Sequence, residues 1–338
     1  MSESTAPCVV GVDGGSTKTV ALVADGQGHI IGAGRGRGST CTTADIAPAM
    51  QVVIETVESA LGQAGRSSDD LAAGVFGLSG ADWPEDHERR QAFLSEYGIA
   101  RRVFIKNDAF AGLRAGTRNT FGVVIAAGTS CNAAAIAPDG REWHFGYYQD
   151  YGGASTVGRE AIRAVLHAED GRGQPTALAQ IVLDSLGYPT PEALLRGRLA
   201  GKIPNASVAA LCPAVFEAAF DGDAVATRII VDQGVALAEY ATALIRRYDM
   251  QELAFDVVLA GSVFKGKGHL LVDTITQAIA QVAPRARVKR QQFEPAVGGL
   301  LLAYDALGMT VTDSMYDNLA RTVPDPEFFS TKRDAGKE

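Results

Sequence analysis

One pattern of apolar runs and turns occurs twice in the chain, and it restricts the possible fold more than any other feature. Near the N-terminus an apolar run meets Gly14-Gly15 and several hydroxyl residues, and Asp25-Gly26 follows 11 residues later. In the middle of the chain an apolar run meets Gly128-Thr129, and Asp139-Gly140 follows at the same interval. Short apolar runs separated by such turns predict a β-meander. The letters of the two copies differ, so the repeat is one of structure and not of sequence.

Helical and strand patterns alternate after each meander. Helices are expected at stretches such as 44–63, where apolar residues recur at helical spacing, and 206–220, and a strand is expected at 254–260. A length of 338 residues is sufficient for two domains of ordinary size. We therefore expect two α/β halves, each of which begins with a β-meander.

Composition excludes several classes of function. The net charge is −8 and no stretch is strongly basic, which argues against nucleic acid as a partner. No apolar run approaches the roughly 18 residues of a membrane helix, and the segment MSESTAP has no export signal. The four cysteines lie far apart and form no metal-binding spacing. We therefore expect a cytoplasmic protein with reduced thiols and no membrane partner.

The loop that starts at Gly14 has the composition of a phosphate-binding loop, because glycines permit close approach of the backbone to an anion. It is not a Walker loop, since Lys18 follows Thr17 and a strand follows the lysine. It also lacks the glycine spacing of a dinucleotide loop. Two interpretations remain: a hairpin whose N–H groups and hydroxyls face a phosphate, with Asp13 nearby for magnesium, or a tight turn without a ligand. The second loop, Gly128-Thr129-Ser130, favours the first, because two such loops could hold one polyphosphate.

Several short motifs occur in the order found in one protein family. They are GVDGGSTKT (11–19), GLSGAD (77–82), KNDAFAG (106–112), AAGTSCNA (126–133), DYGG with GREA (150–161) and LAGSVF (259–264). By these motifs the chain resembles the BadF/BadG/BcrA/BcrD ATPase family and, within it, the N-acetylglucosamine kinase-like proteins of the actin-like sugar kinase superfamily. The resemblance covers about residues 8–308. It implies an α/β fold of two actin-like (ribonuclease H-like) lobes, with ATP and Mg²⁺ bound in the cleft between them.

The resemblance and the repeated pattern together predict the domain boundaries. Residues 1–116 are expected to form the N-terminal lobe. Residues 117–308 are expected to form the C-terminal lobe, with a helical insertion at about 155–250. Residues 309–338 are expected to pack back on the N-terminal lobe and to end in a frayed tail.

The resemblance also implies which residues bind the nucleotide. Asp13 is implied as the magnesium ligand. The residues implied to bind ATP lie in three segments: Gly14, Gly15, Ser16, Thr17 and Lys18; Gly128, Thr129 and Ser130; and Gly261 and Ser262. For Gly261-Ser262, and for the later pair Gly298-Gly299, close packing of a helix against a strand is the alternative. For Lys18 the alternative is a solvated charge on a hairpin.

Asp108 is the candidate catalytic residue. It ends the apolar run RRVFIKND and begins a helix, and in the family the Asp at this place accepts the proton of the attacking sugar hydroxyl. Phosphoryl transfer depends on positioning and charge neutralisation, and a carboxylate can orient a hydroxyl and accept its proton. The alternative is that Asp108 only caps the helix that follows.

The sugar is implied to contact residues from several loops, and some of them depart from the family pattern. The implied substrate-binding residues are Ser79, Gly80, Asn107, Asp108, Asn132 and Asp150. For Asp150 the alternative is a turn residue in a Gly-rich loop. Tyr151 replaces a Glu of the family motif, and Ser39-Thr40-Cys41 stands where the family has a sugar-contacting Asn. These departures leave the identity of the sugar open.

The function implied is an ATP-dependent kinase that phosphorylates the 6-hydroxyl of an amino sugar, N-acetylglucosamine or glucosamine. We expect the amino sugar and ATP as partners and a homodimer as the assembly. An ATP-driven activator of a radical dehydratase or acyl-CoA reductase is the alternative, because it shares the ATPase fold. Such activators hold an iron–sulfur cluster between subunits through cysteines, whereas Cys131 of this chain lies within the second Gly-hydroxyl loop segment.

Overall fold

The computed structural model describes residues 7–41, 45–146 and 152–330. The start of the helix expected at 44 and the candidate sugar residue Asp150 lie outside these ranges. The chain divides into two compact units. The first unit comprises Met1–Thr120 and Gln291–Glu338, and the second comprises Phe121–Arg290.

The sheet of the first unit contains the predicted meander. Its strands are β1 (Cys8–Gly14), β2 (Lys18–Ala24), β3 (Ile30–Arg37), β4 (Leu71–Leu78) and β5 (Val103–Lys106), in the spatial order β3-β2-β1-β4-β5. β1, β2 and β3 pair antiparallel, whereas β4 and β5 continue the sheet parallel to β1. The carboxyl ends of β1, β4 and β5 therefore lie at one edge of the sheet.

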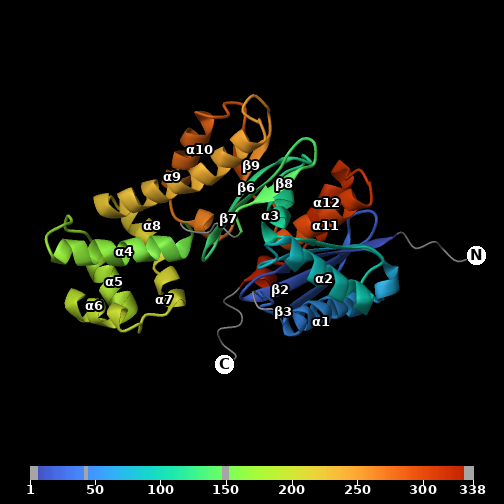
Figure 1. Ribbon diagram of the computed structural model, residues 1–338, viewed down its shortest axis with the longest axis horizontal. Coiled ribbons are helices and arrows are strands. Elements are labelled where there is room, and N and C mark those ends of the chain that lie inside the picture. The colour runs from blue at the N-terminus through green and yellow to red at the C-terminus, as the bar shows by residue number, and fades with distance from the viewer. Residues whose placement is uncertain (1–6, 42–44, 147–151, 331–338) are drawn as a thin grey trace, which may run out of the picture. The chain divides into compact units, whose positions relative to one another are not determined.

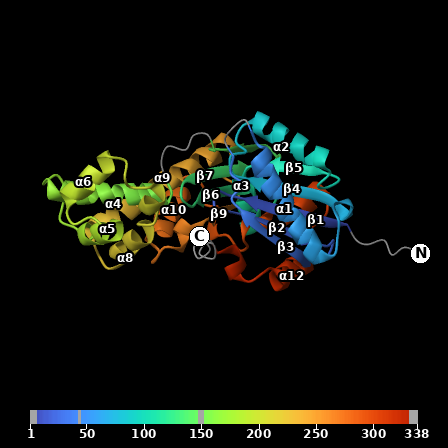
Figure 2. The same cartoon turned by 90° about the horizontal axis from the view of Figure 1, so that it is seen from below.

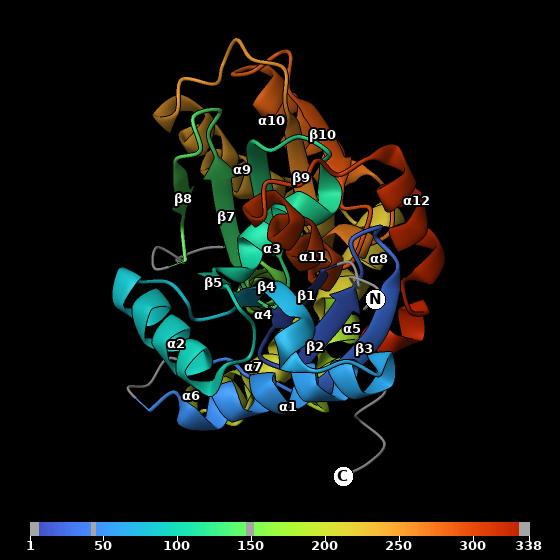
Figure 3. The ribbon, with the colours of Figure 1, turned by 90° about the vertical axis from the view of Figure 1, so that its right-hand side faces the viewer.

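Helices cover both faces of this sheet (Figure 3). On one face lies α1 (Ala47–Ala64), whose buried side chains share an apolar cluster with Val10 and Val12 of β1. On the other face lie α11 (Pro295–Ala306) and α12 (Asp313–Thr322), which pack on Val9. Side chains of a strand alternate between the two faces, so neighbouring valines of β1 enter different clusters. The unit is completed by α2 (Pro84–Tyr97), α3 (Asp108–Gly116) and the 3₁₀ turns η1 (Ser68–Asp70) and η3 (Pro326–Phe329).

The position of α11 differs from the expected boundary of the C-terminal lobe at residue 308. A Cβ added to Gly298 would lie 1.9 Å from the carbonyl oxygen of Ala111, and one added to Gly299 would lie 2.9 Å from the Cα of Gly11. The helix thus packs directly on α3 and β1, and the chain re-enters the first unit at Gln291. These two glycines serve close packing, which was the alternative to a nucleotide contact.

The second unit repeats the topology of the first. Its strands are β6 (Gly122–Ala127), β7 (Cys131–Ile136), β8 (Glu142–His144), β9 (Asp256–Ala260) and β10 (Arg287–Arg290), in the order β10-β9-β6-β7-β8. An antiparallel meander is again extended by two parallel strands. Two α/β units with this shared strand order are the predicted actin-like fold.

Most helices of the second unit come between β8 and β9 in chain order, and Figure 1 shows them as a group beside the sheet. They are α4 (Ala154–Glu169), α5 (Leu178–Leu186), α6 (Pro191–Leu199), α7 (Asn205–Ala209), α8 (Cys212–Phe220) and α9 (Ala224–Arg247), and β9 is followed by the 3₁₀ turn η2 (Ser262–Lys265) and α10 (Leu270–Ala280). The prediction of a single helix at 206–220 was wrong, because this stretch forms two helices, α7 and α8. Pro213 lies in the first turn of α8, where its missing N–H and fixed φ are accommodated.

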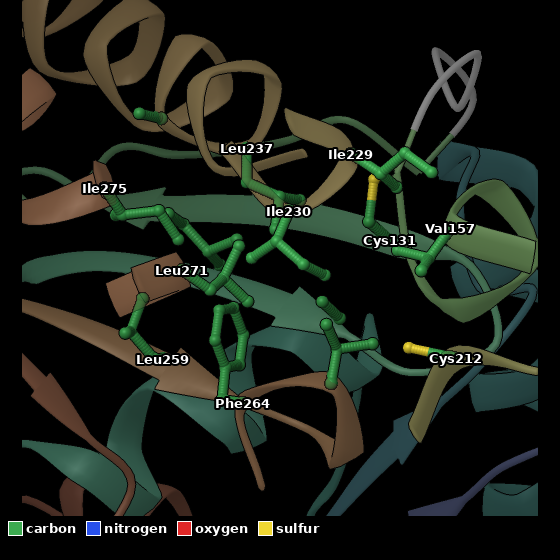
Figure 4. Close-up of a cluster of buried hydrophobic side chains, with 14 of the residues drawn as sticks. Cys131, Val157, Cys212, Ile229, Ile230, Leu237, Leu259, Phe264, Leu271 and Ile275 are labelled. Carbon is green, nitrogen blue, oxygen red and sulfur yellow. The ribbon is translucent and has the colours of Figure 1, made fainter. Parts of the chain in front are cut away.

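The core of the second unit joins the sheet to these helices. Figure 4 shows Cys131 of β7 beside Val157 of α4 and Ile229 of α9, with Leu237 nearby on the same helix. In the described parts of the chain, none of the helices combines the length and apolar character that crossing a bilayer requires.

Candidate functional site

Several candidate residues of the first unit lie at one edge of its sheet, where the parallel strands β1, β4 and β5 have their carboxyl ends. Gly77 of β4 pairs with Asp13 of β1 on one side and with Lys106 of β5 on the other. Asp13, Ser79 and Asp108 therefore lie on three neighbouring parallel strand ends. In open α/β sheets, ligands bind beyond the carboxyl ends of parallel strands.

The first Gly-hydroxyl loop is a tight hairpin between β1 and β2. The N–H of Gly15 donates to the carbonyl of Lys18 at 3.0 Å, and the carbonyl of Gly15 accepts from the N–H of Ser39. The carbonyl of Gly14 accepts from the N–H of Ser79 at 2.8 Å. A Cβ on Gly14 would lie 2.6 Å from the Ser39 hydroxyl oxygen, so the neighbouring loops hold this backbone tightly. Ser16 and Thr17 are exposed at the tip.

The residues that follow the tip are held by other parts of the first unit. The ammonium of Lys18 donates to the carbonyl of Phe329 and lies 5.9 Å from the centre of its ring. The hydroxyl of Thr19, which is buried, donates to the carbonyl of Arg37 and lies 2.8 Å from the hydroxyl oxygen of Ser39. Lys18 is thus engaged with the C-terminal segment, whereas Gly14–Thr17 present the loop's backbone and hydroxyls.

The side-chain cap of α3 is supplied by Asn107 and not by Asp108. The Oδ1 of Asn107 accepts from the N–H of Ala109 at 3.0 Å, and its Nδ2 donates to Asp82 at 2.8 Å. Asn107 is buried, and Asp108 occupies the first helical position. The side-chain oxygen that caps α3 at Ala109 therefore comes from Asn107, so the cap motif does not account for Asp108.

Asp13, Asp82 and Asp108 form a carboxylate cluster at this edge. Burial, followed by the charges of Asp13 and Asp82, raises the pKa of Asp108 to about 7. Burial raises the pKa of Asp13 to about 6, although the charge of Lys18 acts in the opposite direction. Burial also raises the pKa of Asp82, against the hydrogen bond from Asn107. Strongly shifted carboxyl groups of this kind are typical of functional sites.

The donor set of the carboxylate cluster fits magnesium. Magnesium prefers oxygen ligands and is usually held by one or two carboxylates together with substrate phosphates and water. Among the described residues no group of three or more His, Cys, Asp or Glu side chains could hold a metal by itself. Asp13, with Asp108 close by, offers the smaller carboxylate set that a phosphate-bound magnesium ion needs, and a cation there would offset the charge of Asp13 that helps to raise the pKa of Asp108.

Ser79 and Gly80 lie in the turn after β4, and this turn is anchored by a residue that the sequence analysis missed. Arg90 of α2 is 1% exposed. One of its terminal nitrogens donates to the carbonyls of Gly80 at 2.9 Å and Cys41 at 2.6 Å, and the other lies 3.3 Å from the carboxylate of Asp86. An arginine in a polar helical stretch gives no sequence signal of this role. Asp82 was also missed as a site residue, although it lies within the recognised motif GLSGAD and could have been found there.

The second Gly-hydroxyl loop joins β6 to β7 and packs on the start of α4. The N–H of Gly128 donates to the carbonyl of Ser130, and the carbonyl of Thr129 accepts from the N–H of Ser155 at 3.0 Å. A Cβ on Gly153 would lie 2.5 Å from the backbone of Ser130, so only glycine fits there. A Cβ on Gly128, by contrast, would meet no atom within 4 Å. The outer side of this loop is open, and Thr129 and Ser130 are exposed.

Gly261 and Ser262 lie beside this second loop. Gly261 has φ 105°, and a Cβ there would lie 2.4 Å from the carbonyl oxygen of Ala127, the residue before Gly128. Ser262 is exposed. Asn132 lies on β7 opposite Ala126, with its side chain buried. The structure therefore brings together the nucleotide residues predicted for the second unit, whereas Asp150 lies outside the described residues.

The cysteines bear on the activator alternative. Cys8, Cys131 and Cys212 are buried, and the Sγ of Cys41 donates to the carbonyl of Asp45. Burial raises the pKa of Cys212 to about 12 and also raises that of Cys8. Metal clusters are held by thiolates, so buried thiols with raised pKa values are poor ligands for a cluster shared between subunits.

Several known proteins are similar to this chain over most of its length. The chain is 28% identical over 312 residues to an N-acetyl-D-glucosamine kinase of Dictyostelium discoideum, with 88% of this chain and 98% of the relative covered. It is 24% identical to an N-acetylmuramic acid/N-acetylglucosamine kinase of Clostridium acetobutylicum, with 87% and 97% covered. The solved structure of a candidate N-acetylglucosamine kinase from Chromobacterium violaceum is 27% identical and superposes with a TM-score of 0.68, with 88% and 99% covered. The sequence profile of one family matches residues 10–303. The chain belongs to the BadF/BadG/BcrA/BcrD ATPase family.

Proposed function

We propose that this protein is an ATP-dependent kinase that phosphorylates an amino sugar, N-acetylglucosamine or glucosamine, at its 6-hydroxyl. The observation that carries the proposal is Asp108, whose carboxyl lies at a strand end with a pKa of about 7 while Asn107 caps the helix. A base with a pKa near the working pH is well suited to accept a proton from a hydroxyl. The kinase names of the full-length relatives support the same class of reaction.

In the proposed reaction the sugar hydroxyl oxygen forms a bond to the γ-phosphorus of ATP. The bond between that phosphorus and the bridging oxygen of ADP breaks, ADP leaves, and the hydroxyl proton passes to a carboxylate oxygen of Asp108. The backbone of Gly14–Thr17 in the first unit and of Gly128–Ser130 in the second would bind phosphate oxygens. Ser79, Gly80, Asn132 and Asp150 would orient the sugar.

Asp13 would hold the magnesium ion, which supplies charge neutralisation on the phosphates when it is bound. Lys18 donates to Phe329, so its part in nucleotide binding rests on the family resemblance and not on its contacts. Arg90 would act as a positioning residue, because its hydrogen bond fixes the carbonyl of Gly80 in the proposed sugar loop.

The decisive experiment is an ADP-release screen of the full chain with ATP and Mg²⁺. The sugars are N-acetylglucosamine, glucosamine, N-acetylmannosamine, glucose and N-acetylmuramic acid, with 6-deoxy-N-acetylglucosamine as the matched control. We expect release that depends on an amino sugar and disappears with the 6-deoxy analogue. ATP hydrolysis at the same rate with and without every sugar would contradict the kinase proposal and favour the activator alternative.

A further inference from the structure

A pocket of about 180 Å³ lies among the helices of the second unit, away from the two Gly-hydroxyl loops in sequence. It is formed by α4, α6, α7 and the segment before α7; the three helices lie together in Figure 1, and Figure 2 shows α4 and α6 side by side from below. The lining residues are Arg159, Ile162, Arg198, Ile203, Asn205 and Val208. Polar and cationic groups therefore share the pocket with an aliphatic wall.

The two arginines of the pocket carry charge that no carboxylate balances within the described residues. Arg159 donates from one Nη to the hydroxyl of Thr156 at 2.9 Å, which leaves four of its five N–H donors. The guanidinium of Arg198 makes no hydrogen bond or ion pair with any described residue. Both side chains are exposed, so both can meet a ligand from solvent.

Neighbouring arginines on the same helices are paired, which makes the pair in the pocket distinctive. Arg163, one turn after Arg159 on α4, lies 3.3 Å from the carboxylate of Glu160. Arg196 on α6 lies 2.7 Å from the carboxylate of Glu192. In a chain of net charge −8, carboxylates are available to balance arginines, yet the guanidinium groups of Arg159 and Arg198 pair with no carboxylate among the described residues.

The frame of the pocket is held firmly. A Cβ on Gly158 of α4 would lie 1.9 Å from the carbonyl oxygen of Val208, so α4 and α7 touch backbone to backbone. The hydroxyl of Thr156 donates to the carbonyl of Gly152 and accepts from the N–H of Gly152 and from Arg159. Arg159 is thereby oriented before any ligand arrives, which lowers the entropy cost of binding.

We propose that this pocket binds a small organic anion. The carboxylate or phosphate of the ligand would be held by the guanidinium groups of Arg159 and Arg198, with Asn205 as an additional donor. Its carbon skeleton would pack against Ile162, Ile203 and Val208. Carboxylates and phosphate monoesters both present negatively charged oxygens that the two arginines can bind. Titration with one ligand of each class therefore distinguishes them.

The test is calorimetric titration of the full chain, at low ionic strength, with two anionic probes and one neutral probe. The probes are N-acetylglucosamine 6-phosphate, N-acetylmuramic acid and uncharged N-acetylglucosamine. Arg159→Met and Arg198→Met remove one guanidinium each, and Arg163→Met on α4 is the matched control. An unchanged melting temperature establishes that each variant is folded.

We expect at least one anionic probe to bind with an affinity that both pocket variants reduce about ten- to hundredfold, as loss of a charge-assisted hydrogen bond predicts. Arg163→Met should leave that affinity unchanged. Binding of only the phosphate, or only the carboxylate, identifies the ligand class and supports the site. The proposal is overturned if the pocket variants bind both anionic probes as the unaltered protein does, whether or not the chain proves to be a kinase.

Discussion

The two units share one strand order but differ in the chemistry at the carboxyl edge of their sheets. The first unit places three carboxyl groups there, Asp13, Asp82 and Asp108, and burial raises all three pKa values, with the charges of Asp13 and Asp82 raising that of Asp108 further. At the corresponding edge, the second unit's loops present backbone and hydroxyl groups of Gly128–Ser130 and Ser262. The shared scaffold therefore does not determine the chemistry, and the proposed proton transfer and metal binding both fall to the first unit.

The units also differ in what is inserted between their third and fourth strands. In the first unit, β3 is followed by α1 and a 3₁₀ turn before β4. In the second unit, α4–α9 occupy the same position between β8 and β9, and they contain the pocket of Arg159 and Arg198. A connection at this point of the fold tolerates insertion because the strand order does not depend on its length.

The sharpest test of the difference in edge chemistry is Asp108→Asn, which keeps the shape of the side chain and removes the proton acceptor. We expect turnover to fall by about 10²–10⁴, the usual contribution of a general base, with little change in nucleotide affinity. The matched control is Asp139→Asn in the second unit, an exposed turn residue. Turnover at the unaltered rate in Asp108→Asn would show that the carboxylate has no part in catalysis.

Gly128→Val tests the role of the second unit's loop. A Cβ at Gly128 would meet no described atom within 4 Å, so the variant should fold but block the approach of a phosphate to the backbone. Losing charge-assisted hydrogen bonds of this kind raises the KM for ATP by about 10–100-fold. Steady-state kinetics should show a much smaller change in the KM for the sugar. Equal KM values for ATP in the variant and the unaltered protein would exclude Gly128 from the nucleotide site.

Thr129→Val and Thr17→Val compare the two loops directly, because each removes one exposed hydroxyl at nearly constant volume. We expect each change to weaken ATP binding by about three- to tenfold, which corresponds to one hydrogen bond. Titration with a non-hydrolysable ATP analogue measures both affinities. If only one variant binds more weakly, one loop alone holds the phosphates and the proposed symmetry of the two loops is wrong.

The smallest expected effect is on stability. Because the pKa of Asp108 is raised in the folded protein, folding favours its protonated form, and stability is lost as the pH rises from about 4 through 7. Asp108→Asn removes this loss. After allowance for solvent screening, we expect a gain of about 1 kcal/mol above pH 7, or about 2–4 °C in Tm, and no gain near pH 4. A gain that is the same at both pH values would point to packing and not to ionisation.

Local patterns predicted the parts of the fold that depend on neighbours in sequence. The two meanders, their glycine loops and the start of a helix at Asp108 all follow from alternation, turn residues and chain order. Asp13 lies near the end of β1 and Asp108 shortly after the end of β5, and the family motifs singled both out as candidate site residues.

Features that depend on distant contacts could not be predicted in this way. Nothing local indicates that Gly299 meets Gly11, or that the guanidinium of Arg90 reaches the carbonyls of Cys41 and Gly80. The division of α7 from α8 at Pro213 was a local signal that helical spacing obscured. The helix α12 was not predicted at all, although Thr312 caps it with its side chain.

The return of α11 to the first unit has a consequence for the order in which the protein is made. One face of that unit's sheet, including Val9 and Val75, is covered by α11 and α12. While the ribosome synthesises residues 121–290, this face has no cover, because the helices that pack on it have not yet been translated. The second unit, whose chain is continuous, can complete its core first. We therefore expect nascent chains that stop before residue 295 to contain a protease-resistant second unit and a first unit that is still open to cleavage.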